Sequence, residues 1–92
     1  MILARVVGTV VATRKDPRLE GKKLLVVQHM NPDSSPKDTY VVALDTVGAG
    51  VNDKVICIAG SSARMASGMK ETPVDTAIVG IIDEISLDTG QG

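Results

Sequence analysis

Few residues of this sequence carry side chains suited to acid–base or nucleophilic chemistry. It has one histidine, His29, and one cysteine, Cys57. A catalytic histidine or cysteine needs a second group to activate or orient it, and a structural zinc site takes about four ligands. The sequence offers His29 and Cys57 no such set. We therefore expect His29 to be structural or exposed, and Cys57, in an apolar run, to be a small buried hydrophobe.

The serines, glycines and acids also lack a catalytic pattern. Ser61 and Ser62 follow Gly60 and precede Ala63, so the Gly-x-Ser-x-Gly motif of many hydrolases is missing. The segment Gly-Ala-Gly at 48–50 is not followed by the Gly-Lys-Ser/Thr ending of a phosphate loop. The adjacent acids at 83 and 84 point to opposite faces of a strand. The sequence thus predicts a protein that is not an enzyme and that has no cofactor or metal.

Composition limits the size and class of the protein. Its 92 residues are enough for one small domain. With 10 basic and 11 acidic residues the net charge is −1, which argues against a dedicated nucleic-acid binder. There is no Phe or Trp and only one Tyr, so the core must be aliphatic and stacking platforms for bases are missing. No run approaches the roughly 20 apolar residues that cross a bilayer. The single cysteine and the lack of an evident signal peptide predict a cytoplasmic protein.

Hydrophobic patterning predicts five strands and one short helix. In the first strand the even positions are apolar or Gly, and Gly8 predicts a bend or bulge. Two prolines predict a turn over residues 31–38. Residues 1–85 then form a single barrel domain, and residues 86–92 form a polar tail. The strands are expected at residues 2–13, 24–30, 40–44, 54–59 and 74–85, and the helix at 61–69.

The segment between the first two strands, residues 14–23, is polar and holds five basic and two acidic residues. One interpretation is a contact patch for an anionic partner. The other, which we favour, is a solvated loop that connects two strands.

The predicted order of elements is four strands, a helix and a fifth strand. This all-β pattern with small α content is typical of a five-stranded OB-like β-barrel, closed or partly open, with one short helix before the last strand. The usual OB helix lies between the third and fourth strands, so the correspondence is loose. A five-stranded sandwich is the main alternative.

The last strand predicts that the protein is an oligomer. Both faces of residues 74–85 are mainly apolar at the centre. A small barrel has only one interior, so the outer face of this strand needs a cover, because large apolar patches rarely stay exposed. The short helix covers part of it at most. A neighbouring subunit is the expected cover for the rest, and small domains gain stability by such association.

Four stretches of the sequence, taken in order, form a specific set. They are residues 8–13 (GTVVAT), 45–51 (DTVGAGV), 60–64 (GSSAR), and the pair 73–75 (PVD) with 79–83 (VGIID). Over residues 1–84 the chain resembles the EutN/CcmL family of bacterial microcompartment vertex proteins. The resemblance implies small OB-like barrels that assemble as cyclic homopentamers. Such pentamers close the vertices of polyhedral shells that are otherwise tiled by hexamers.

The same resemblance implies the partners and the location of the protein. Its partners are its own copies and the hexameric shell proteins, and neither nucleic acid nor a membrane is among them. It lies in the cytoplasm, in the shell of a bacterial microcompartment. An OB-type nucleic-acid or ligand-binding module is the alternative function, suggested by the five-strand pattern and the basic segment 14–23. The balanced charge and the missing aromatics oppose that alternative.

By resemblance, the glycine-rich turn after the third strand and the turn after the fourth are candidates for the subunit interface and the five-fold axis. Arg64 is expected to pair with an acidic group or a carbonyl across that interface, or else to be an exposed helix residue. Where the family commonly has Gly-Glu, this chain has Asn52 and Asp53. Asn accepts left-handed geometry and Asp keeps the negative charge, so we expect the turn to survive. The candidate residues are Asp45, Thr46, Val47, Gly48, Ala49, Gly50, Gly60, Ser61, Ser62 and Arg64.

Overall fold

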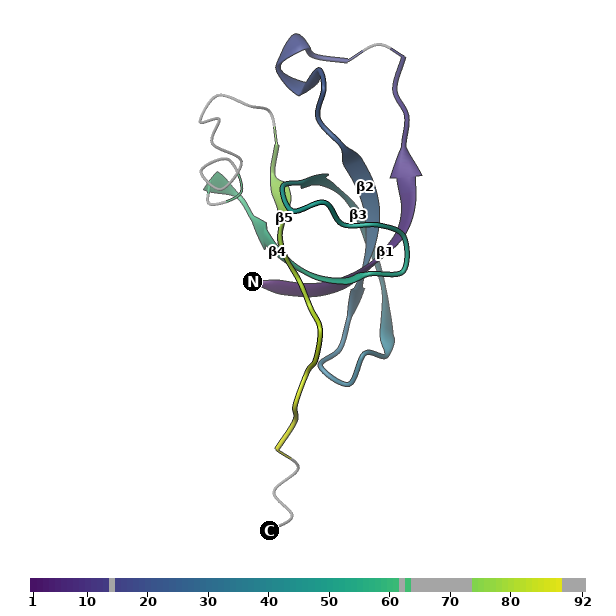
Figure 1. Ribbon diagram of the computed structural model, residues 1–92, viewed down its shortest axis with the longest axis vertical. Helices are drawn as coiled ribbons and strands as arrows, with labels where there is room; N and C mark the ends of the chain where they lie inside the picture. Colours follow the sequence, from purple (N-terminus) through teal and green to yellow (C-terminus); the bar gives the residue numbers. More distant parts are fainter. Residues whose placement is uncertain (14, 62, 64–73, 89–92) are drawn as a thin grey trace.

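The structure is a computed structural model, and it describes the 92 residues of the chain except 14, 62, 64–73 and 89–92 (Figure 1). A 3-10 turn, η1 (Pro17–Leu19), lies between the first two strands. The described part of the chain is therefore all-β with five strands, as predicted. The strands are β1 (Ile2–Val10), β2 (Leu24–Met30), β3 (Pro36–Asp45), β4 (Lys54–Ala59) and β5 (Thr76–Ile81).

The five strands close into a barrel in the order β1-β2-β3-β5-β4. Neighbouring strands are antiparallel except β3 and β5, which are parallel. The ladder between β1 and β4, from Ile2 opposite Cys57 to Arg5 opposite Lys54, closes the sheet on itself. The barrel prediction is confirmed, and the alternative of a five-stranded sandwich is wrong.

The core is aliphatic, as the composition requires. In the first half of β1 the even-numbered Ala4 and Val6 are fully buried. The register of β1 against β2 shifts between Val6 and Gly8, which confirms the bulge predicted at that glycine. β1, β2 and β4 bury side chains at alternate positions, whereas β5 begins with three consecutive buried residues. The buried cluster consists of Ala4, Val6, Leu25, Val27, Ala43, Ala49, Val55, Cys57 and Ile78.

Two predicted strand boundaries near the start of the chain are wrong. β1 ends at Val10 and not at residue 13, because its last partner is Leu24 and the next side chain, Val11, is 93% exposed. β3 begins at Pro36 rather than at residue 40, opposite Met30. A proline is tolerated at the first position of a strand, where its missing N–H is not needed. The predicted turn over 31–38 therefore shrinks to residues 31–35.

The end of the chain also differs from the prediction. β5 covers Thr76–Ile81 and not 74–85, because its antiparallel partner β4 has only six residues to pair with. The predicted helix at 61–69 lies for the most part outside the described residues. The predicted polar loop 14–23 contains η1, which sequence reasoning missed. In the described part of the chain, no helix has the length and apolar character needed to cross a membrane.

Candidate functional site

The glycine-rich turn, residues 45–53, is organised by the aspartate that ends β3. We call these residues the Asp45 loop. Asp45 Oδ1 accepts a hydrogen bond from the backbone N–H of Val47 at 3.1 Å, and its Oδ2 accepts one from Ala49 at 2.9 Å. The side chain of Asp45 is only 2% exposed. Aspartate at the start of a turn commonly binds the backbone ahead of it in this way. The carboxylate therefore fixes the path of the first half of the loop.

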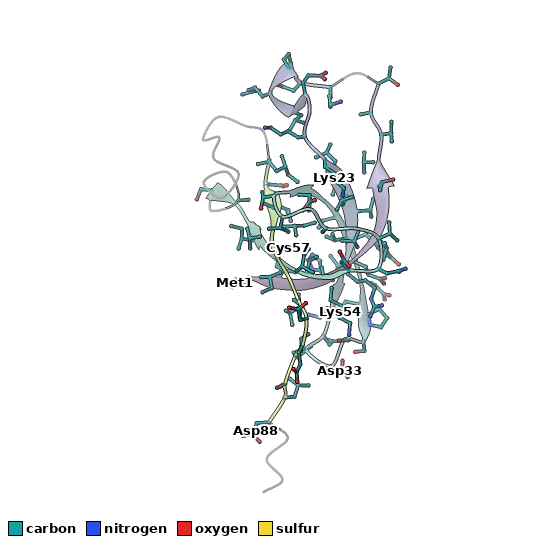
Figure 2. All side chains as sticks on the ribbon, viewed as in Figure 1. Met1, Lys23, Asp33, Lys54, Cys57 and Asp88 are labelled. Atoms are coloured by element: carbon teal, nitrogen blue, oxygen red, sulfur yellow. The ribbon has the colours of Figure 1, made fainter. Side chains whose placement is uncertain are left out.

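A lysine that directly precedes β2, Lys23, supports the same loop. Lys23 Nζ donates to the carbonyl oxygen of Ala49 and lies 3.7 Å from Asp45 Oδ2. The backbone N–H of Asp45 donates to Lys23 O at 2.9 Å. Figure 2 shows Lys23 on the barrel, with its side chain among those of the strands. One side chain thus joins the start of the loop to its middle.

The second half of the Asp45 loop is tied to β1 and to itself. Asp53 Oδ2 accepts from Gly50 N at 2.8 Å. Asn52 N donates to Val6 O at 2.8 Å, and Val6 N donates to Asp53 O at 2.9 Å. Asn52 has φ +77°, the left-handed geometry expected for it. The turn survives the replacement of the usual Gly-Glu by Asn52 and Asp53, as predicted.

These contacts divide the candidate residues of the loop into supporting and exposed ones. Asp45 and Ala49 face inward, and Ala49 is fully buried. Thr46 reaches β5, where its N–H and Oγ1 both donate to Ile78 O at 3.3 and 2.7 Å. Val47 is 39% exposed, and Gly48 has φ +79° with open space around its Cα. The exposed tip of the loop is therefore small, apolar and rigidly held.

The second candidate segment follows β4. Gly60 has φ +71°, and its N–H donates to Asp75 O at 2.8 Å. Ser61 is exposed, whereas Ser62 and Arg64 lie outside the described residues, so the predicted interface contact of Arg64 also lies outside them. The partner of Gly60, Asp75, directly precedes β5, and the partner of Thr46, Ile78, lies three residues further on, roughly 10 Å away. The two candidate segments flank the same strand of the barrel.

The residues considered for chemistry have structural surroundings. Cys57 is fully buried, and burial raises the pKa of its thiol to about 11, so it is a packed side chain rather than a nucleophile. Within the described residues, no group of three or more His, Cys, Asp or Glu side chains is placed to hold a metal ion. His29 is partly buried beside a surface hollow.

Most described basic side chains of the segment 14–23 are engaged inside the chain. Arg18 forms two hydrogen bonds with the Asp16 carboxylate, at 2.9 and 2.7 Å, and these lower the pKa of Asp16 to about 2. Lys15 Nζ donates to Ala12 O at 3.3 Å. With Lys23 bound to the Asp45 loop, these contacts favour the interpretation of a structured connecting loop over that of an anion-binding patch.

Sequence reasoning missed one important residue of the site. The function of Asp45 in its own turn follows from its position before Thr46 and Val47. The function of Lys23 does not, because its contact with Ala49 spans 26 residues of sequence. No local pattern predicts which lysine of a polar loop returns to the barrel.

The architecture defines a class of protein. A small closed barrel with apolar side chains on its outer surface is typical of a domain that associates with other subunits. The family model described as "Ethanolamine utilisation protein EutN/carboxysome" matches residues 1–83. The chain belongs to the EutN/CcmL family of bacterial microcompartment shell vertex proteins, and it is a structural shell component rather than an enzyme.

Similar proteins of this family span different kinds of microcompartment. The chain is 47% identical over 90 residues to the carboxysome shell vertex protein CcmL of Synechocystis sp., covering 98% of this chain and 90% of that one. It is 47% identical to the microcompartment shell vertex protein PduN of Salmonella typhimurium, covering 94% and 99%. The solved structure of GrpN, described as a pentameric microcompartment shell protein from Rhodospirillum rubrum, superposes with a TM-score of 0.88 at 42% identity, covering 96% of this chain and 100% of that one.

Proposed function

We propose that five copies of this chain close into a ring, and that the ring fills the vertices of a polyhedral microcompartment shell. Membership of the EutN/CcmL family and the similarity to the pentameric GrpN support this proposal. The observation that carries it is the presence of exposed apolar side chains on a barrel whose sheet is fully closed.

Barrel closure restricts how copies can associate. The ladders that close the barrel pair Ile2–Arg5 of β1 with β4 and Leu44–Asp45 of β3 with β5, so these parts of the strands cannot take an added strand from another subunit. There, contact comes from outward-facing side chains and loops. Tyr40 and Val42 on β3 are 59% and 48% exposed, and Ile81 at the end of β5 is 42% exposed. A ring needs two different patches that fit each other, and these strands provide apolar groups on separate parts of the barrel.

The Asp45 loop provides the third contact surface of the proposal. Its exposed members Thr46, Val47 and Gly48 meet the neighbouring subunit near the five-fold axis, while Asp45 and Ala49 hold them in place from below. A tip that is already fixed by hydrogen bonds loses little conformational entropy on binding. The turn at Gly60 and Ser61 provides the facing surface, together with Ser62 and Arg64.

The ring also meets hexameric shell proteins along its five sides. A layer of hexamers is flat, and it closes into a polyhedron only where five-fold units introduce curvature. This role needs neither nucleic acid nor a membrane as partner, in agreement with the net charge of −1 and the few aromatic side chains.

Native mass spectrometry tests the proposal directly. Five chains of 9.6 kDa give a ring of about 48 kDa. A dominant mass of one chain at micromolar concentration would refute the ring.

The contribution of the loop tip is tested by Gly48→Val with Gly21→Val as a matched control. Both glycines have positive φ, +79° and +75°, and open space around them, so both changes strain the backbone similarly. Only Gly48 lies at the proposed interface. We expect Gly48→Val to raise the dissociated fraction more than Gly21→Val does, and an equal effect of the two changes would remove the Asp45 loop from the interface.

A further inference from the structure

Beyond β5 the chain leaves the barrel as an extended arm, residues 82–88, which we call the C-terminal arm. Figure 1 shows it running away from the strands. Its root is still attached, because Ile82 N donates to Lys54 O at 2.8 Å. Further along, Ile85 is partly exposed and Leu87 is 52% exposed. The arm thus carries apolar side chains and the acids Asp83 and Glu84 outside the barrel.

A surface hollow lies where β1 begins and β2 ends. It consists of two adjoining parts of about 270 and 190 Å³ that share His29 and Met30, and we call it the His29 hollow. Each part on its own is smaller than the roughly 300–1,000 Å³ of a typical small-molecule site, so each part has the size to hold a few side chains of a peptide segment. The lining that matters here is Met1, Leu3 and Met30 as apolar groups, Arg5 and Lys37 as cations, and His29.

Three side chains of the His29 hollow, those of His29, Arg5 and Lys37, matter for what it can bind. The Nε2 atom of His29 is buried and has no hydrogen-bond partner there. Neither of the ion pairs described above, Arg18–Asp16 and Lys23–Asp45, involves Arg5 or Lys37. A buried polar atom without a partner is costly. The His29 hollow is therefore suited to bind a segment that carries both apolar and acidic side chains.

We infer that the C-terminal arm of one subunit occupies the His29 hollow of a second copy of the chain. Asp83 and Glu84 match the cations of the hollow, and Ile85 and Leu87 match its apolar lining. No residue of the arm lines either part of the hollow in its own chain. Seven extended residues span roughly 23 Å, which is enough to reach an adjoining barrel.

The geometry of a ring makes this exchange complete. In a closed heterologous ring each subunit gives its arm to the next and receives one from the subunit before it, so no hollow stays empty. The inference rests on the proposed pentamer and adds a contact that strengthens it. The barrel fold itself does not depend on the arm, because the buried core cluster contains no arm residue.

A cross-linking experiment tests whether arm and hollow meet. In a Cys57→Ala background, Ile85→Cys is combined with Lys37→Cys, and the protein is treated with a short bismaleimide. The control combines Ile85→Cys with Val11→Cys, which is 93% exposed and lies at the other end of β1, so the reagent reaches it freely. We expect linked chains, up to the full ring, for the Lys37 pair and little linkage for the Val11 pair.

The outcomes separate the arm from the ring. A native mass of one chain for the unaltered protein would overturn the proposed function. Three results would overturn the arm exchange while leaving the pentamer intact. These are no link between positions 85 and 37, equal linkage of position 85 to position 11, or linkage only inside one chain.

Charge reversal provides an independent measurement. Lys37→Glu is expected to raise the concentration at which half of the rings dissociate by roughly 2–5-fold, the effect of losing a partly exposed ion pair. Adding Glu84→Lys is expected to restore most of that affinity. Lys22→Glu, an exposed lysine of the loop before β2, is the control for net charge. The proposed contact would be contradicted if Glu84→Lys did not restore ring affinity and if Lys22→Glu weakened the ring as much as Lys37→Glu does.

Discussion

Replacement of Asp45 by alanine is expected to loosen the Asp45 loop and to destabilise the barrel measurably. The nearly inaccessible carboxylate accepts two backbone hydrogen bonds, from Val47 and Ala49. Hydrogen bonds to charged groups contribute about 1.5–3 kcal/mol each, and less where water can replace the lost acceptor. Val47 N is exposed and Ala49 N is partly buried. We expect Asp45→Ala to lower the free energy of unfolding by about 2–4 kcal/mol.

The ion pair with Lys23 adds little to this value. Lys23 is 52% exposed at a separation of 3.7 Å, so water screens the pair, which contributes roughly 0.5 kcal/mol. A double-mutant cycle with Lys23→Met is expected to give a coupling energy below about 1 kcal/mol. A larger value would mean that the bond from Lys23 to the carbonyl of Ala49 depends on the carboxylate.

Urea unfolding followed by circular dichroism measures these changes. All variants must be compared at one subunit concentration, because dissociation of an oligomer makes the apparent stability depend on concentration. Asp38→Ala, an exposed aspartate of the same strand, is the matched control and is expected to change stability by less than about 0.5 kcal/mol. A loss below about 0.5 kcal/mol for Asp45→Ala would refute the view that this carboxylate organises the loop. We also expect Asp45→Ala to increase the dissociated fraction in native mass spectra.

Three further predictions concern packing and protonation. Cys57 should resist alkylation in the folded state. Because the pKa of its thiol is raised from 9.0 to about 11, the stability that the protonated thiol contributes is present below pH 9 and is lost between pH 9 and 11, by up to about 1.4 kcal/mol per pH unit. Urea unfolding at high pH measures this slope, and Cys57→Ala should remove it. Gly80→Ala should change the free energy of unfolding by less than about 1 kcal/mol, since the new Cβ would lie 3.7 Å from Ile56, an ordinary contact. Gly60→Ala should lower it by about 1–2 kcal/mol, because Gly60 has φ +71°. The reverse order of the two variants in thermal melts would contradict the assigned backbone geometry. Hydrogen bonds from the hydroxyl and N–H of Ser35 lower the pKa of Asp33, so its carboxyl resonance should titrate with a midpoint below 3.8, and a midpoint at or above 3.8 would mean that the hairpin turn is not formed as described.

The barrel was predictable because β1, β2 and β4 bury alternate side chains over much of their length. The even positions of β1 enter the core as their pattern indicates, and Gly8 falls at the register shift. The missing aromatics made an aliphatic core unavoidable. Such information is local, and it determines which segments become strands and which face each strand buries.

Boundaries and long-range contacts were less predictable, because they depend on partners elsewhere in the chain. β5 stops at Ile81 because β4 offers no further partner, although the apolar pattern continues to Ile85. Pro36 looked like a turn residue, yet it starts a strand because Met30 lies opposite. The candidate loop, Asp45 included, was identified through family resemblance, although the way Asp45 binds its own turn follows ordinary turn chemistry. Lys23 was found only in three dimensions.

The order of strands around the barrel has a consequence for the timing of synthesis. Among the described strands β5 is the last to be made, yet it lies between β3 and β4 in the sheet and pairs with both. A nascent chain that ends before Thr76 therefore has two open strand edges and a core without Ile78. Because domains fold as units while chains emerge from the ribosome, this barrel closes only after β5 has been made. The Asp45 loop then gains its support from β5, the two bonds from Thr46 to Ile78 O, later than its other contacts.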